Sequence, residues 1–133
     1  MENLVKDFLK QKRFAVAGSF RSREKFAYKI LISLIEKGYM VFPVNPHINE
    51  VEGRVSYKTI SDIPFEVDVV DIVTPPSVTE AILKECLQKG IKRVWLQPGA
   101  ESPDAIKFCQ DNDIKVIHSM CVMLESLKER GNP

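Results

Sequence analysis

The residues best suited to chemistry in this sequence stand where a short apolar run, Phe14–Ala17, meets a glycine and a basic loop. We expect the glycine to let the backbone turn sharply into a helix, whose unpaired N–H groups and positive dipole end favour a phosphate. A single glycine is a weak motif, and the alternative is that the segment only makes a turn. The candidate phosphate loop comprises Gly18, Ser19, Phe20, Arg21, Ser22, Arg23 and Lys25.

Small polar groups also follow the other expected strands. An open parallel sheet binds ligands outside the carboxyl ends of its strands, near the point where the strand order reverses. The segments expected at those ends are rich in glycine, proline, hydroxyl and amide groups: 18–19, 44–46, 74–76, 97–99 and 119–121. Turns use such residues for structural reasons as well. With the basic loop beside them, their shared chemistry suits a phosphorylated nucleotide.

One position narrows the class of nucleotide. A site for NAD uses an acidic residue near the end of the second strand to bind the adenine ribose. Asn45 stands there instead, and the neighbouring first loop is cationic. This combination favours a nucleotide that carries an additional phosphate on its ribose, and both NADP and coenzyme A carry one.

Apolar periodicity predicts the elements that must position these groups. Apolar and β-branched runs predict strands at 14–17, 39–44, 67–73, 93–96 and 115–117, with a short edge strand within 53–57. Apolar residues at helical spacing predict helices at 4–9, 27–35, 78–87, 103–112 and 123–130. We expect Ser77 or Thr79 to cap the third of these helices, Gly90 to end it, and residues 61–64 to form a turn.

Strands that alternate with helices indicate βαβ units, a parallel sheet and right-handed crossovers. In the run Val67–Val73 only Asp68 and Asp71 are polar, which is typical of a central strand covered on both faces. Both aspartates then need hydrogen-bonding partners. The predicted fold class is α/β: a single Rossmann-like domain over residues 1–133, with an open parallel sheet of five or six strands and helices on both faces.

Length and composition exclude several classes of function. A chain of 133 residues suits one domain and is too short for a binding domain plus a catalytic one. The 19 Lys and Arg against 18 Asp and Glu leave a formal net charge of +1, which gives no global attraction to nucleic acid or to an anionic membrane. No apolar run approaches a membrane span, and the first residues lack a signal-peptide pattern. Three cysteines without a CxxC pair indicate reduced thiols and a cytoplasmic protein.

A series of segments occurs in the order of a known family: Gly18-Ser19 with its basic loop, Phe42-Pro43-Val44-Asn45-Pro46, Glu50-Val51-Glu52-Gly53, Val67–Val73, Val94-Trp95-Leu96-Gln97-Pro98-Gly99 and Cys121-Val122-Met123-Leu124-Glu125. On these segments the chain resembles the stand-alone CoA-binding domain proteins. That family is similar to the N-terminal CoA-binding domain of the succinyl-CoA synthetase α subunit. The resemblance extends from Phe14 to Glu125.

The resemblance implies that the chain binds coenzyme A or an acyl-CoA. It assigns the adenine and phosphates to the first loop and to two further segments, Val44, Asn45 and Pro46, and Val73, Thr74, Pro75 and Pro76. The chain departs from the family pattern at two places: the first loop lacks its usual prolines, and Ser119-Met120 replaces an Asp-Arg pair before Cys121.

We expect no catalysis from the chain itself. The synthetases use a phosphohistidine from a second domain, which this sequence does not contain. We interpret His47 and His118 as structural or solvated residues. We interpret Cys121 as a small buried residue in preference to a reactive thiol. The scattered histidines and cysteines form no metal set. Two alternatives stay open: a fragment of an NADP-dependent oxidoreductase, and a nucleotide-sensing regulatory module acting on a protein partner. A homo-oligomer stays open too.

Overall fold

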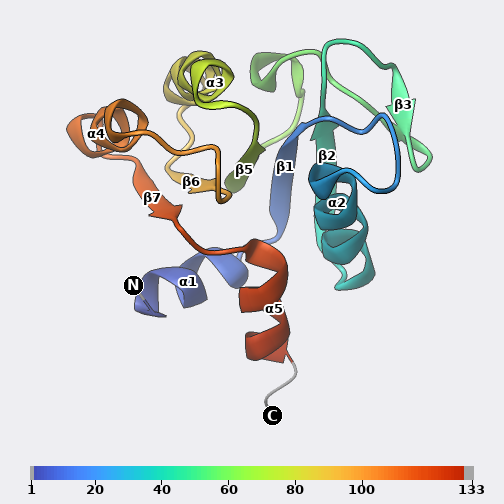
Figure 1. Ribbon diagram of the computed structural model, residues 1–133, viewed down its shortest axis with the longest axis horizontal. Coiled ribbons are helices and arrows are strands. Elements are labelled where there is room, and N and C mark those ends of the chain that lie inside the picture. The colour runs from blue at the N-terminus through green and yellow to red at the C-terminus, as the bar shows by residue number, and fades with distance from the viewer. Residues whose placement is uncertain (1, 131–133) are drawn as a thin grey trace.

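Five parallel strands form the centre of the protein. The computed structural model describes the backbone of residues 2–130 and the side chains of residues 3–126. The sheet has the order β2-β1-β5-β6-β7 (Figure 1). Its strands are β1 (Arg13–Gly18), β2 (Met40–Val44), β5 (Val69–Val73), β6 (Arg93–Leu96) and β7 (Lys115–His118). This architecture confirms the Rossmann-like α/β fold that the sequence predicts.

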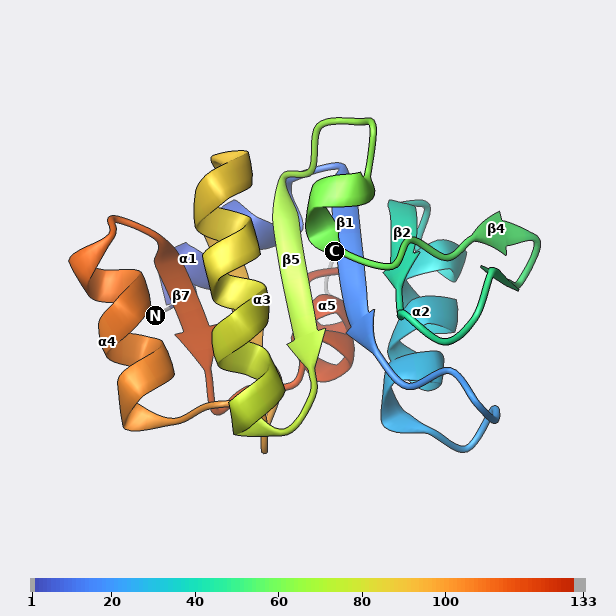
Figure 2. The same ribbon diagram turned by 90° about the horizontal axis from the view of Figure 1, so that it is seen from above.

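Helices cover both faces of this sheet, as expected. One face carries α1 (Glu2–Leu9), α2 (Phe26–Glu36) and α5 (Val122–Arg130), and the other carries α3 (Pro76–Lys89) and α4 (Pro103–Asp111), as Figure 2 shows. Two buried apolar clusters fill the two interfaces. Trp95 belongs to the cluster under α1, α2 and α5, whereas Leu83 and Leu96 belong to the cluster under α3 and α4.

The central strand β5 explains the almost continuous apolar run in the sequence. Val69, Val70 and Ile72 are fully buried, because helices lie over both faces of the strand. The strand begins two residues later than expected. Asp68, just before it, binds the start of β1 through its side chain. Its carboxylate accepts hydrogen bonds from the backbone N–H groups of Lys12 (3.2 Å) and Arg13 (2.9 Å). Asp68 therefore ties the start of β1 to the start of β5.

The segment between β2 and β5 is more irregular than the sequence predicts. Instead of a single edge strand, β3 (Glu50–Val51) and β4 (Arg54–Val55) form a small antiparallel hairpin outside the main sheet. A short 3₁₀ helix, η1 (Ile60–Asp62), follows where we expect a turn. Tyr57 lies beside the end of β2 through a parallel bridge to Val44. This segment therefore returns to the carboxyl edge of the sheet.

The start of α3 also differs from the expectation. The helix begins at Pro76, so neither Ser77 nor Thr79 is its cap, and that prediction is wrong. Thr79 is fully buried in the first turn, with its hydroxyl oxygen 2.8 Å from that of Thr74. The end of α3 is as expected, because Gly90 follows it in the left-handed conformation (φ 81°) that glycine adopts without strain.

The strand order reverses beside β1. The chain runs from β1 outward to β2, and then returns to place β5 on the other side of β1. Gly18 at the end of β1 pairs in register with Val73 at the end of β5. Open α/β sheets bind ligands at such a reversal, outside the carboxyl ends of the strands.

Candidate functional site

A cleft of about 450 Å³ opens at this reversal point. Part of the predicted site lines it: Gly18, Ser19, Val44, Asn45, Pro46, Val73, Thr74 and Pro75. These residues come from the ends of β1, β2 and β5, which are distant in the chain and meet at one edge because the strands are parallel. The other predicted residues do not line the cleft: Phe20, Arg21, Ser22, Arg23, Lys25 and Pro76.

A second wall of the cleft is one face of α3, a helix that the sequence predicts without assigning it to the site. Val78, Ala81 and Ile82 lie at i, i+3 and i+4 and all line the cleft. Val78 is 46% exposed, whereas Leu83 and Cys86 on the adjoining face are fully buried. The signal in the sequence is the apolar stripe of this helix, part of which stays exposed at Val78.

Polar side chains outside the predicted set also line the cleft: His47, Lys58 and Glu85. The ammonium of Lys58 donates a hydrogen bond to the carbonyl oxygen of Pro46 at 3.3 Å. The carboxylate of Glu85 accepts one from the backbone N–H of Ile60 at 2.7 Å. No local motif marks these residues, because their meeting depends on how the segment before η1 returns to β2.

Gly18 permits close packing and does not form a sharp turn. The prediction that this glycine lets the backbone turn into the helix is therefore wrong. The residue belongs to β1 and keeps strand geometry. A β-carbon at this position would lie 2.6 Å from Cβ of Ala27 and 3.0 Å from the carbonyl oxygen of Val73. The first separation is shorter than real Cβ contacts, and the second is tighter than most of them. The glycine therefore lets the first turn of α2 pack directly against the ends of β1 and β5.

Asn45 joins the ends of β1 and β2. Its Nδ2 donates to the carbonyl oxygen of Gly18 at 2.7 Å, and its Oδ1 accepts from the backbone N–H of His47 at 2.8 Å. Its own backbone N–H donates to the carbonyl oxygen of Tyr57 at 2.8 Å. Asn45 therefore fixes the shape of the cleft where β1, β2 and the returning segment meet.

The basic loop between β1 and α2 is held by contacts away from the cleft. Phe20 is buried, and its ring packs edge-on against Tyr28. The guanidinium of Arg23 lies 3.4 Å from the carboxylate of Glu52, in the β3–β4 turn, and 5.7 Å from the centre of the Tyr28 ring. The Tyr28 hydroxyl donates to the same carboxylate, which raises the pKa of Tyr28. Arg23 is therefore already paired within the protein.

A buried acid, Asp71, lies on the face of β5 opposite the cleft. It pairs in register with Val16 and Trp95, which pack under α1, α2 and α5. Gln97 Nε2 donates to Asp71 Oδ1 at 2.6 Å, while Oδ2 has no partner among the described residues. Gln97 Oε1 accepts from the backbone N–H of Val122 at 3.3 Å, which connects the pair to the start of α5. Burial raises the pKa of Asp71 to about 8.

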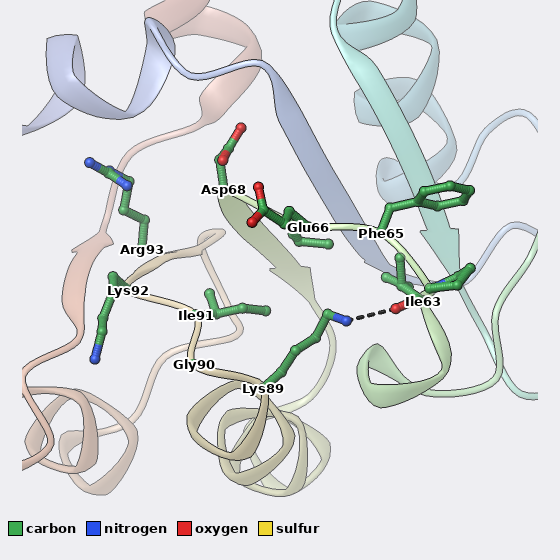
Figure 3. A pocket seen from close by; sticks show the side chains of 11 residues that line it. Ile63, Phe65, Glu66, Asp68, Lys89, Gly90, Ile91, Lys92 and Arg93 are labelled. Atoms are coloured by element: carbon green, nitrogen blue, oxygen red, sulfur yellow. Dashed lines mark hydrogen bonds between the residues drawn. The ribbon is translucent and has the colours of Figure 1, made fainter.

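A larger cleft, of about 680 Å³, lies at the amino ends of β5 and β6 (Figure 3). Most of its charged side chains form hydrogen bonds or ion pairs within the protein. The ammonium of Lys89 donates to the carbonyl oxygen of Ile63 at 2.6 Å, drawn dashed in Figure 3. Arg93 forms an ion pair with Asp7 at 2.9 Å, and Asp68 binds the start of β1. Because ligands of open α/β sheets bind at the opposite ends of the strands, we place the candidate site in the smaller cleft.

The remaining candidate groups lie outside that cleft. His118, at the end of β7, has Nδ1 2.9 Å from the hydroxyl oxygen of Ser119. Burial raises the pKa of the Cys109 thiol to about 11 and also raises that of Cys86, so both thiols stay protonated. Within residues 2–130, no group of three or more His, Cys, Asp or Glu is placed to hold a metal ion. Over the same stretch, no helix combines the length and the apolar character that a membrane span requires.

Fold and cleft together define a Rossmann-like domain whose cleft lies at the reversal of strand order. Residues 12–126 match the CoA binding domain family, so the chain belongs to that family. The matched range includes every segment that lines the cleft.

Several relatives are much longer enzymes. The ADP-forming acetate–CoA ligase II of Archaeoglobus fulgidus is 36% identical over 90 residues, or 66% of this chain. The alpha subunit of the ADP-forming acetate–CoA ligase I of Pyrococcus furiosus is 42% identical over 89 residues, or 62% of this chain. The chain spans only 13% of the first protein and 19% of the second.

Solved structures of similar length share the fold. A conserved hypothetical protein from Pyrococcus furiosus is 35% identical with a TM-score of 0.83, and the match covers 86% of this chain and 99% of that one. A hypothetical protein from Pyrococcus horikoshii OT3 is 30% identical with a TM-score of 0.92, covering 96% and 91% of the two chains. The same fold therefore also occurs in other chains of about this size.

Proposed function

We propose that residues 1–133 act as one domain that binds coenzyme A or an acyl-CoA in the cleft at the ends of β1, β2 and β5, with no catalysis of its own. The observation that carries this proposal is the position of the cleft. It lies at the reversal of strand order and is built by segments that the CoA binding domain family covers.

The walls of the cleft suit the parts of such a nucleotide. Val78, Ala81 and Ile82 offer an apolar surface on which a flat base can pack. Ser19 leads from the cleft toward the start of α2, whose first turn contains no acidic residue and whose N-cap makes no side-chain hydrogen bond. Backbone N–H groups at such a helix start favour a diphosphate.

The small number of ionisable side chains in the cleft, His47, Lys58 and Glu85, supports binding without turnover. Among the described residues, Glu85 is the one carboxylate that lines it, and that carboxylate already accepts the N–H of Ile60. General acid–base chemistry on a thioester needs a free, positioned proton donor or acceptor. The ligase activity of the longer relatives is not transferred, because this chain spans less than a fifth of their length.

Titration calorimetry of the purified chain with CoA, acetyl-CoA, NADP and NAD tests the proposal. We expect CoA and acetyl-CoA to bind, and the Ala81→Trp variant to lose both ligands because the indole fills the cleft. Lys84→Trp is the matched control, since Lys84 is exposed on α3 outside the cleft. The parent should release no free thiol from acetyl-CoA. Binding of NADP without CoA, or steady thiol release, would contradict the proposal.

A further inference from the structure

The cations of the first loop and the walls of the cleft belong to different surfaces. None of Arg21, Arg23 and Lys25 lines the cleft. Arg23 is also ion-paired with Glu52. Among the described residues, Lys58 is the one lysine or arginine that lines the cleft. The charge that an anionic ligand meets there therefore comes from Lys58.

The backbone around Lys58 is fixed to the end of β2. The N–H of Tyr57 donates to the carbonyl oxygen of Pro43 at 3.0 Å, and its carbonyl accepts from the N–H of Asn45 at 2.8 Å. On the other side, Thr59 Oγ1 accepts from a backbone N–H of η1 at 3.2 Å. Because both neighbours are held, Lys58 starts from a defined position at the cleft, which lowers the entropy lost when it binds a ligand.

The ammonium of Lys58 binds one residue of the cleft and has donors to spare. It donates to the carbonyl oxygen of Pro46, another residue of the cleft, at 3.3 Å. An ammonium has three N–H donors, so two stay available. No ion pair within the described residues neutralises it. Such a group can bind a phosphate as a point charge.

We propose that Lys58 binds the ribose phosphate of CoA and thereby gives the cleft its preference for CoA over dephospho-CoA. This inference rests on the proposed function. The diphosphate is assigned to the segment from Gly18 to the start of α2, whereas Lys58 enters from the separate segment before η1. The two ligands differ only in the ribose phosphate, so a cation away from the diphosphate can distinguish them. The basic loop does not take part in this distinction.

Titration calorimetry with CoA and dephospho-CoA tests the role of Lys58. In the parent, CoA should bind more tightly. Lys58→Gln should lower the affinity for CoA about tenfold, as expected for loss of one charge-assisted hydrogen bond, and leave that for dephospho-CoA unchanged. Lys58→Arg should keep most of the preference. Lys84→Gln is the matched control, since it removes an exposed cation of α3 outside the cleft and should leave both affinities unchanged. Lys25→Gln, in the basic loop, should leave the preference for CoA over dephospho-CoA unchanged.

Each other outcome overturns the inference in a recognisable way. If Lys58→Gln lowers the affinity for both ligands equally, Lys58 binds another part of CoA. Loss of the preference in Lys25→Gln alone would return the role to the basic loop. If the parent binds both ligands equally, the ribose phosphate is not bound at all, although the proposed function stands. If the parent binds neither ligand, the proposed function is wrong, and this inference fails with it.

Discussion

Ionisation of Asp71 should govern how the stability of this protein depends on pH. The side chain is fully buried, with one oxygen bound to Gln97 and the other without a partner among the described residues. Burial raises its pKa from 3.8 to about 8, because an ionised carboxylate loses its hydration there and gains only one hydrogen bond in return. The folded protein therefore keeps a proton on Asp71 at pH values where the unfolded chain has released it.

The sign and size of the effect follow from this difference. Below pH 3.8 the carboxyl is protonated in both states, and its contribution to stability is fully present. Between pH 3.8 and about 8 only the folded state holds the proton, so the free energy of unfolding falls by about 1.4 kcal/mol per pH unit. The loss approaches about 5 kcal/mol by the end of that range, comparable to the whole stability of a small domain.

Another carboxyl acts in the opposite direction at lower pH. The hydrogen bond from Arg93 lowers the pKa of Asp7, so Asp7 stabilises the fold above its ordinary pKa and loses that contribution as the solution becomes more acidic. Measurements between pH 5 and 8 separate the two effects. In that range Asp7 is ionised in both the folded and the unfolded state, whereas Asp71 is ionised in the unfolded state alone.

Urea unfolding at several pH values from 5 to 9 measures the effect of Asp71. The parent should lose stability up to about pH 8 and then level off. Asp71→Asn keeps an acceptor for Gln97 and has no charge, so its stability should vary little over this range. Asp68→Asn is the control, because Asp71 is intact there and the decline of the parent should persist. A flat parent, or an Asp71→Asn variant that declines equally, would refute the reasoning.

Two further substitutions test the strand ends around the cleft. Gly18→Ala should lower the free energy of unfolding by about 1–3 kcal/mol, seen as a lower urea midpoint, because the added methyl group meets Ala27 Cβ at 2.6 Å; an unchanged midpoint would contradict the packing role. Asn45→Ala removes both side-chain hydrogen bonds and should cost about 1–2 kcal/mol and weaken CoA binding. The control Asn112→Ala removes an amide hydrogen bond on α4 and should lower stability alone.

The fold could be predicted from the sequence because its signals are local. Helix α4 lies within the range expected for it, with Pro103 in its first turn and Ser102 capping it by accepting the N–H of Ala105 at 3.0 Å. Strand Arg93–Leu96 has the expected bounds. In each case a few adjacent residues determine the conformation, and the tertiary structure agrees with them. The cap expected for α3 is wrong, because Pro75 is the N-cap residue and Pro76 is the first residue of the helix.

The cleft could be predicted only in part, for a physical reason. Parallel strands bring their carboxyl ends to one edge, so the alternation of strands and helices leads to Ser19, Asn45 and Thr74 without any contact being known. The α3 wall and Lys58 depend instead on how a helix and an irregular segment pack over that edge. Lys58 reaches the cleft because Tyr57 bridges to Val44, a pairing with no counterpart in local sequence.

The basic loop shows why a cluster of charges in sequence does not define a binding surface. Arg23 belongs to the candidate phosphate loop, but its partner Glu52 lies 29 positions further along the chain. Glu52 accepts from both Arg23 and Tyr28, and so links the β3–β4 turn to α2 and to the loop before it. The charge of Arg23 thus acts within the protein, on a partner that belongs to the β3–β4 hairpin. The charge that faces the cleft comes from Lys58, an isolated lysine that the hairpin and the bridge to β2 bring to the same edge.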